Sequence, residues 1–197
     1  TRRYGLHQPT YAPLSWGTVM EDFDLDGNFD LFIANGHIFP QADQPPETGS
    51  RYRQANLLFA SDGARFVDVS GEAGPGLAVV ESSRGVAAGD IDGDGDIDMV
   101  ISNVAAPPTL LRNDSPHRGS WLLVDASGAL RVTVEHGGRR RVRDAVRGGS
   151  YLSVSDTRFH FGLGPVARVD RLRVLWPGGK ETVLRDVQTN RAVRVRR

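Results

Sequence analysis

Two copies of a nine-residue acidic loop, residues 22–30 and 90–98, carry the side chains of this chain that are best suited to chemistry. Carboxylates stand at positions 1, 3, 5 and 9 of both copies, and a glycine stands at position 6. These hard oxygen ligands around a tight turn suit Ca²⁺, which takes about six to eight oxygens at roughly 2.3–2.6 Å. Without a cation, two carboxylates about 4 Å apart repel each other by about 4 kcal/mol at an effective dielectric of about 20. The sequence therefore predicts two calcium sites.

The loops differ from the calcium loop of an EF-hand. An EF-hand places a bidentate Glu at position 12, on an exiting helix. Here position 12 is Ile33 in the first copy and Ile101 in the second. The surrounding runs, residues 31–35 and 99–103, are short, apolar and partly β-branched, which is typical of buried strands. The EF-hand interpretation is therefore excluded.

In a strand–loop–strand unit, Asp30 or Asp98 at position 9 is expected to close the site. Position 7, Asn28 or Asp96, is expected to add its backbone carbonyl. The alternative is a solvated turn, because Asp and Gly both favour turns. Two copies with identical spacing favour metal binding. A structural ion is favoured over a catalytic one, because no acid, base or nucleophile accompanies either loop in the local sequence.

The repeat is wider than the loops, since the two copies start 68 residues apart. The pattern of strand, acidic loop, strand, turn and a strand that contains Leu-Leu, at residues 57–58 and 110–111, occurs in both copies. Four antiparallel strands per unit, repeated radially, describe a β-propeller blade. Residues 37–53 are expected to form an insertion loop in the first blade. Two blades cannot close a propeller of four to eight, so we expect a C-terminal piece of a longer chain, with exposed sheet edges and the remaining blades as partners.

The N-terminal module resembles the FG-GAP/VCBS repeat. The resemblance rests on the acidic loop followed by residues 30–35, on residues 56–59 and on residues 66–70, and it covers about residues 14–114. Integrin α-subunits and many secreted bacterial proteins carry this repeat in seven-bladed propellers, with Ca²⁺ in the blade hairpins. The resemblance implies these ligands: Asp22, Asp24, Asp26 and Asp30, with Asn28 through its backbone, and Asp90, Asp92, Asp94 and Asp98, with Asp96 through its backbone.

Charge divides the chain into two predicted modules, residues 1–115 and 116–197. The first contains 17 acidic and 7 basic side chains, and the second contains 7 acidic and 17 basic ones. Such asymmetry indicates two modules, joined by a linker at residues 115–120. The expected strands of the second module are residues 121–125, 130–135, 140–146, 151–154, 158–161, 169–176, 182–185 and 192–195. Short strands separated by Gly-rich turns predict a small β-sandwich.

The second module resembles the ASPIC/UnbV domain. The resemblance rests on residues 149–154, 159–164 and 169–179 and on Asn190. That domain typically follows FG-GAP/VCBS repeats at a C-terminus, and the order is the same here. The predicted fold is therefore all-β, a partial β-propeller of about two blades followed by a small β-sandwich.

Other side chains allow weaker interpretations. The run Arg139, Arg140, Arg141 and Arg143, with Arg147, could bind a polyanion; the alternative is an exposed strand whose charges face water or the acidic module. Nucleic acid is disfavoured because no nucleic-acid motif or run of interleaved aromatics is found. His160, between two phenylalanines, is expected to be structural, and Trp176 is expected in the core. The scattered His7, His37, His117 and His136 show no ligand spacing.

The expected function is therefore a secreted, calcium-stabilised module that binds a protein or glycan, and not an enzyme. The alternative is an enzyme or enzyme-associated protein of secondary metabolism, with a pocket at the seam between the modules. Zero cysteines exclude disulfides, and the sequence has no apolar run of about 18 residues that could span a membrane. Calcium sites of this kind, with the family resemblance, favour an extracellular or periplasmic location.

Overall fold

The computed structural model describes residues 2–44, 50–116, 119–146 and 148–197. Within this part of the chain the regular structure is β-strand, apart from three short 3₁₀ turns, η1 (Arg2–Tyr4), η2 (Pro40–Asp43) and η4 (Pro75–Ala78). The strands form several sheets, none of which closes on itself in the described residues. The predicted all-β class is confirmed. No helix of the described chain is long and apolar enough to cross a membrane.

The first sheet is an antiparallel meander in the order β1-β2-β4-β5. Its strands are β1 (Ser15–Glu21), β2 (Asp30–Asn35), β4 (Leu57–Ser61) and β5 (Phe66–Asp68). This is the four-strand unit expected from the sequence. The stretch between β2 and β4, the predicted insertion, contains η2 and a bridge between Gly36 and Arg53; residues 45–49, with Pro45 and Pro46, lie outside the described residues.

The second sheet has the order β7-β8-β9, with β7 (Ser83–Gly89), β8 (Asp98–Asn103) and β9 (Thr109–Leu111). Four strands were expected for this unit, and the described residues supply three. After β9 the chain leads into β10 (Ser120–Asp125), which pairs in a different sheet. A further pair, β3 (Gln54–Ala55) and β6 (Val80–Glu81), joins the two units.

The two units repeat in register as well as in sequence. In the first hairpin Ser15 pairs with Asn35 and Glu21 with Asp30, with an irregularity between Ser15 and Thr18. In the second hairpin the corresponding pairs and the corresponding irregularity lie 68 residues further on. Even the side-chain hydrogen bond of the first pair, from Ser15 Oγ to Asn35 Oδ1 at 2.8 Å, recurs in the second unit at 2.9 Å. The repeat is therefore structural.

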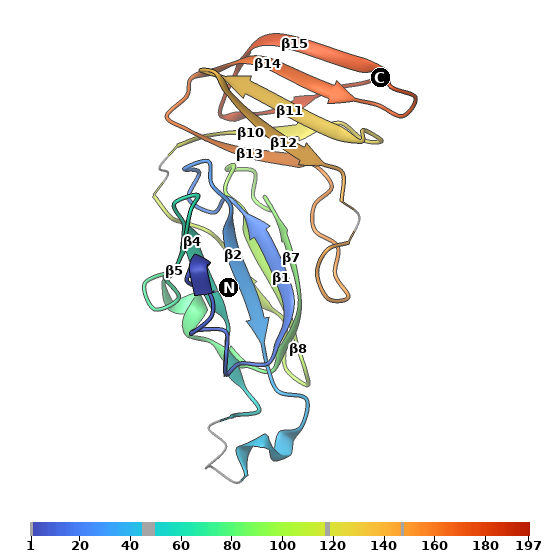
Figure 1. Cartoon of the computed structure of the whole chain (residues 1–197). Helices are drawn as coiled ribbons and strands as arrows, with labels where there is room; N and C mark the ends of the chain where they lie inside the picture. Colours follow the sequence, from blue (N-terminus) through green and yellow to red (C-terminus); the bar gives the residue numbers. More distant parts are fainter. Residues whose placement is uncertain (1, 45–49, 117–118, 147) are drawn as a thin grey trace.

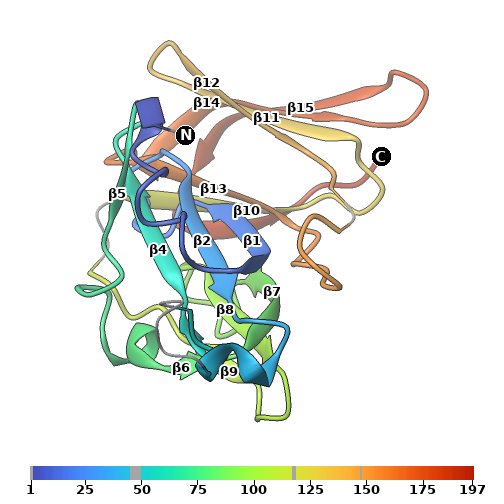
Figure 2. The same cartoon turned by 60° about the horizontal axis from the view of Figure 1, so that its bottom comes forward.

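The two sheets pack face to face, with β1 beside β7 (Figures 1 and 2). Their shared core buries Phe32 and Ala34 from the first unit and Val86, Met99 and Ile101 from the second. Each of these apolar side chains stabilises the fold by about 1.5–3 kcal/mol when fully buried, Ala less. The core holds the two acidic loops at the same end of the sheets, where β1 joins β2 and β7 joins β8.

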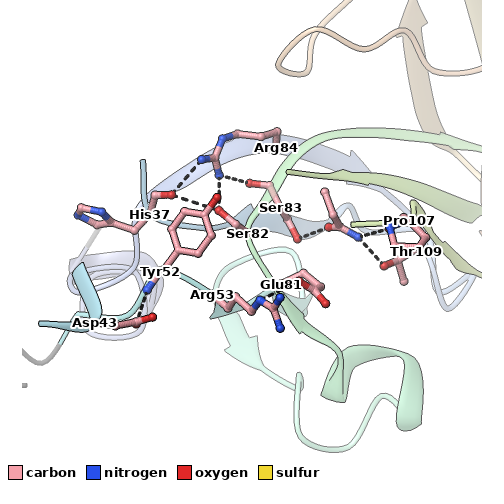
Figure 3. Close-up of polar contacts among 11 residues, drawn as sticks. His37, Asp43, Tyr52, Arg53, Glu81, Ser82, Ser83, Arg84, Pro107 and Thr109 are labelled. Atoms are coloured by element: carbon pink, nitrogen blue, oxygen red, sulfur yellow. Dashed lines mark hydrogen bonds and ion pairs between the residues drawn. The ribbon is translucent and has the colours of Figure 1, made fainter. Parts of the chain in front are cut away.

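At the other end of these sheets, Arg84 ties the units together (Figure 3). Its guanidinium donates to the carbonyl oxygens of Gly36 at 3.2 Å, His37 at 2.9 Å and Ser83 at 2.8 Å. The same group lies 4.6 Å from the centroid of the Trp16 ring. One side chain thus satisfies several backbone carbonyls of both units at once.

The C-terminal strands form two further sheets. One has the order β13-β10-β16, and the other has the order β12-β11-β14-β15. The strands are β11 (Arg131–His136), β12 (Arg139–Asp144), β13 (Phe159–Gly164), β14 (Arg168–Leu175), β15 (Glu181–Gln188) and β16 (Arg191–Arg194). The two sheets share a core that includes Leu122, Phe161, Leu172 and Trp176, and they form two layers in Figure 1. Trp176 is in the core, as predicted.

One expected strand, residues 151–154, is wrong. These residues form turns with a single bridge between Ser150 and Ser153. The segment runs along the N-terminal sheets instead of pairing in a C-terminal one. Its Asp156 N–H donates to Ala88 O at 2.8 Å, and the Tyr151 ring packs edge-on against Trp16 at 5.0 Å. Contacts with the other half of the chain therefore override the local strand pattern.

Candidate metal centres

Each acidic loop folds because particular residues adopt left-handed backbone conformations. At position 6, Gly27 has φ 93° and Gly95 has φ 98°. At position 4, Gly93 has φ 85°, but the equivalent residue of the first loop is Leu25, with φ 61°. A side chain in this region of φ costs roughly 1–3 kcal/mol and persists only where the surroundings enforce it. Leu25 is fully buried against Trp121 and Leu123, so packing holds the first loop in shape.

Short-range hydrogen bonds bend both loops in the same way. At position 3, Asp24 Oδ1 accepts from the amide of residue 26 at 3.2 Å, and Asp92 Oδ1 accepts from that of residue 94 at 3.4 Å. At position 5, Asp26 Oδ1 accepts from the amide of residue 28 at 2.7 Å, and Asp94 Oδ1 accepts from that of residue 96 at 2.9 Å. The carboxylates at positions 3 and 5 therefore fix the turn of their own loop.

The carboxylates at position 9 tie each loop to its sheet. Asp30 accepts from the amide of Phe23 at 2.9 Å and from that of Ser61 at 2.9 Å. Asp98 accepts from the amide of Ile91 at 2.9 Å and from that of Asn113 at 2.8 Å. Both oxygens of each carboxylate thus already accept one hydrogen bond. Each oxygen keeps a second lone pair, so a role at the metal remains compatible with these bonds.

The carboxylates at position 1 are buried and only half satisfied. Asp22 is 2% exposed and Asp90 is 7% exposed. Asp22 Oδ2 accepts from Gly27 at 2.8 Å and Asp90 Oδ1 accepts from Gly93 at 2.7 Å. The second oxygen of each, Asp22 Oδ1 and Asp90 Oδ2, has no hydrogen-bond partner among the described residues. Leaving such a buried acceptor unpaired costs about 1–3 kcal/mol, and more for a charged group.

The buried clusters could hold metal ions. One ligand oxygen each from Asp22, Asp24 and Asp26 lies within 4.8 Å of the others, and the same holds for Asp90, Asp92 and Asp98. Asp30 and Asp94 are not in these groups, although both lie in the loops. Asn28 Nδ2 donates to Asp26 Oδ2 at 3.0 Å and so orients that ligand. The structure does not test the predicted backbone ligands, Asn28 and Asp96.

Burial makes these carboxylates reluctant to ionise without a cation. Burial, together with the negative charges of Asp26 and Asp30, raises the pKa of Asp22 to about 7. Burial likewise raises the pKa of Asp30 to about 6, against the hydrogen bonds from Ser61 and Phe23. The pKa of Asp90 is also raised, with burial as the largest cause. A bound cation would reverse this effect, because it favours the charged form.

The first loop lies against the C-terminal sheets. The amide of Gly164 donates to Leu25 O at 3.0 Å, and the Arg141 guanidinium donates to Gly27 O. A Cβ atom on Gly162 would overlap Asp22 Oδ2. Residues more than 110 positions apart in the chain therefore shape the surroundings of this site.

The second loop meets the same sheets. The Trp121 ring covers Gly95, where a Cβ atom would overlap the indole. The His160 Nε2 lies 2.8 Å from Gly95 O. Burial lowers the pKa of His160 to about 4, so the neutral ring donates from Nε2 to this carbonyl. His160 is buried and bonded to backbone, which agrees with the structural role expected for it, and the Arg158 guanidinium donates to Asp90 O at 3.1 Å.

Sequence reasoning missed the residues that surround the loops. Trp121 contacts both loops, because its cluster also contains Leu25 of the first loop. No spacing rule connects residues 121, 160 or 162 with either loop, and the glycine of the Phe-His-Phe-Gly segment is the one local hint.

The arginines of the predicted polyanion-binding run point in two different directions. Arg141 and Arg143 face the N-terminal half, while Arg139 and Arg140 are exposed. Arg147 and His117 lie outside the described residues.

The seam between the halves contains a hollow of about 220 Å³. Glu21 lines it and forms an ion pair with Arg143, and Asp156 forms one with Arg158 at 2.5 Å. Burial raises the pKa of Glu21, with Arg143 acting against that effect. The acidic groups of the seam are thus matched by arginines that hold the two halves together.

The C-terminal half has relatives among known proteins. Residues 124–197 match the family described as ASPIC and UnbV. The chain is also 29% identical over 178 residues to cartilage acidic protein 1 of Homo sapiens, covering 82% of this chain and 25% of that protein. The protein of the same name from Xenopus tropicalis is 29% identical over 195 residues, covering 91% of this chain and 27% of its own length.

These matches support the ASPIC/UnbV part of the predicted resemblance. The matched region, residues 124–197, contains β13, β14 and the glycine-rich turns on which that resemblance rested. The FG-GAP/VCBS part stays a prediction. The chain spans about a quarter of the length of the curated relatives it matches.

Proposed function

We propose that this chain is part of an extracellular or periplasmic binding module in which two Ca²⁺ ions brace the joint between the N-terminal and C-terminal sheets. The observation that carries the proposal is the pair of buried, unpartnered oxygens, Asp22 Oδ1 and Asp90 Oδ2, at equivalent places in two acidic loops. A cation would satisfy both oxygens and neutralise the carboxylates around them. The role is structural and not catalytic.

The donor set favours Ca²⁺ over other metals. The side-chain donors gathered in both clusters are carboxylate oxygens, which suit Ca²⁺, Mg²⁺ and Mn²⁺ better than the softer metals. Mg²⁺ demands a near-ideal octahedron and keeps several waters, whereas Ca²⁺ tolerates irregular cages with more ligands. The acidic loops are shaped by backbone turns and bordered by backbone carbonyls, so they suit the irregular cage of Ca²⁺ better than the octahedron of Mg²⁺. The predicted ligands Asp30, Asp94, Asn28 and Asp96 would complete such cages.

The proposed role of the ions follows from the contacts between the two loops and the C-terminal half. Both loops carry backbone carbonyls that accept bonds from the C-terminal half: Leu25 O and Gly27 O in the first loop, Asp90 O and Gly95 O in the second. An ion that fixes each loop also fixes the direction of these carbonyls. Metal binding and docking of the two halves would then favour each other, as linkage requires.

The repeated meander supports the propeller hypothesis. Equal register in the two hairpins, face-to-face packing and adjacent β1 and β7 suit neighbouring blades of an FG-GAP/VCBS propeller. Further blades of the whole protein would be partners of these sheets. An extracytoplasmic setting suits such sites, since extracellular modules bind Ca²⁺ at about 10⁻⁴–10⁻³ M.

Calorimetric titration with CaCl₂ tests the proposal. The chelator-treated native chain should take up two ions, and Asp24→Ala or Asp92→Ala should remove one each. At ten times the Kd, each ion should stabilise the fold by about 1.4 kcal/mol, so chelation should lower the melting temperature. Glu181→Gln is the control, because Glu181 is an exposed acidic side chain on β15, in a C-terminal sheet outside both loops. Absence of binding by the native chain would overturn the proposal.

A further inference from the structure

Three arginines share one row across the outer sheet of the C-terminal half. Strand pairing places Arg140 of β12 opposite Glu135 of β11, Glu135 opposite Arg171 of β14, and Arg171 opposite Arg185 of β15. Directly opposed residues of antiparallel strands point to the same face, and strands lie about 4.8 Å apart. The row therefore crosses the whole sheet. The sheet's other face carries Val134 and Leu172, which are buried in the core.

The row is poorly neutralised by the protein itself. Glu135 is shared, since it lies 3.3 Å from Arg171 and 3.8 Å from Arg173 of the next row. Arg171 and Arg185 stand directly opposite each other, and like charges in this position destabilise a sheet. Within the described residues, Arg140 and Arg185 have no acidic partner. Ion pairs within the fold therefore do not explain why three arginines lie in this row.

A hollow of about 390 Å³ lies over this row. Four arginines, Arg139, Arg140, Arg171 and Arg185, line it with two carboxylates, Glu135 and Asp170, and the buried His136. The Nε2 atom of His136 has no hydrogen-bond partner in the described chain. Burial lowers the pKa of His136, and Arg141 and Arg139 act in the same direction while Asp170 acts against them. A neutral imidazole can still donate one N–H to an anion.

We propose that this row and its hollow bind a sulfated glycan, with Arg140, Arg171 and Arg185 each facing an anionic group along an extended chain. Guanidinium groups bind such oxyanions through paired, parallel N–H donors. A nucleic acid is less suited, because base recognition on a sheet uses stacked aromatic side chains. The neighbouring row consists of Val142, Thr133, Arg173 and Val183. The inference rests on the proposed function in treating the chain as a binding module, and it names a ligand class for a surface apart from the metal loops.

The test uses the full chain with Ca²⁺ and a heparin-derived octasaccharide as probe, titrated at several NaCl concentrations. The native chain should bind with an affinity that falls steeply with salt, because counterions are released and charges are screened. Replacing Arg140→Ser and Arg185→Ser together should weaken binding at least tenfold. The slope of log Kd against log salt should decrease by roughly one for each arginine removed. Both side chains are exposed, so the fold should remain intact.

The matched control removes two exposed arginines elsewhere, Arg65→Ser with Arg191→Ser, and should retain octasaccharide binding. Equal loss in both double variants would show a net-charge effect and overturn the site. Failure of the native chain to bind, or equally tight binding of oligothymidylate with the same number of charges, would overturn the glycan assignment. Calcium titration of the same samples separates the two proposals: a native chain that takes up two calcium ions but does not bind the octasaccharide contradicts only the glycan site.

Discussion

Gly162 of β13 lies against Asp22 of the first acidic loop, so closely that a Cβ atom at position 162 would overlap the Oδ2 atom of that carboxylate. Asp22 belongs to the N-terminal sheets and Gly162 to the C-terminal ones. A proposed metal ligand therefore rests on the backbone of the other half. Because Gly162 has no side chain, the Asp22 carboxylate can occupy the space beside its backbone.

We predict that Gly162→Ala weakens the first calcium site and spares the second. The added methyl group displaces Asp22, because the three atoms nearest a Cβ built on Gly162 all belong to Asp22 and Leu25 of the first loop. Affinity for Ca²⁺ at the first site should fall at least tenfold, or about 1.4 kcal/mol, in a two-site calorimetric titration. Gly71→Ala is the control, since nothing lies within 4 Å of a Cβ built there. An equal effect on both sites would contradict the prediction.

Trp121→Ala should weaken both calcium sites, because the ring contacts the second loop at Gly95 and packs with Leu25 of the first. The free energy of unfolding should fall by about 3–5 kcal/mol, as for other buried aromatic truncations. Urea denaturation and calcium titration measure the two effects. Trp176→Ala offers a matched loss of packing in the C-terminal core, away from the loops. If it reduced calcium affinity as much as Trp121→Ala, contact with the loops would not be the cause.

Much of this arrangement follows from local sequence. The hairpin strands, the loops between them and most C-terminal strands are set by the period of apolar residues and by turn residues close in the chain. The two loops repeat so well because their hydrogen bonds run between residues two positions apart, as from the amide of residue 26 to Asp24. Such bonds are determined by residue type and spacing.

The remaining features depend on distant contacts. The parallel pairing of β16 with β10 joins Leu122 to Arg191, and no local pattern specifies it. Leu25 adopts φ 61° because a distant core encloses it, although a glycine would be the local expectation. The segment around Tyr151 has strand-like residues but packs on Trp16 instead. Tertiary contacts overrode propensity there, as is common for short strand patterns.

His160→Leu should destabilise the chain by about 1–3 kcal/mol, because it leaves the buried Gly95 carbonyl without its donor. The ring Nε2 lies 2.8 Å from that oxygen, and leucine fills similar space without an N–H. The second calcium site should weaken more than the first, since Gly95 belongs to the second loop. Thermal unfolding and calcium titration give both readouts. His7→Leu, outside the interface, should change neither.

The stability of the metal-free chain should fall as pH rises from about 4 to about 7, and calcium should abolish this loss. Burial raises the pKa of Asp22 to about 7 and that of Asp30 to about 6 in the folded chain. An unfolded Asp titrates near 3.9. A carboxyl with a raised folded pKa contributes stability below its unfolded pKa and loses it as pH rises through the folded one. The ionised carboxylates within the loop then repel one another, unless Ca²⁺ replaces the protons.

Calcium affinity should accordingly increase over the same window, because metal and protons compete for these oxygens. Melting temperatures of the metal-free and calcium-loaded chain at both pH values measure the effect. His160 acts with opposite sign: burial lowers its pKa from 6.5 to about 4, so its share of stability is lost as pH falls through that range. The carboxylate share is therefore read from the difference between the native chain and Asp22→Asn, which keeps the shape and removes the charge. If metal-free Asp22→Asn lost as much stability as the native chain between these pH values, Asp22 would not be the group responsible.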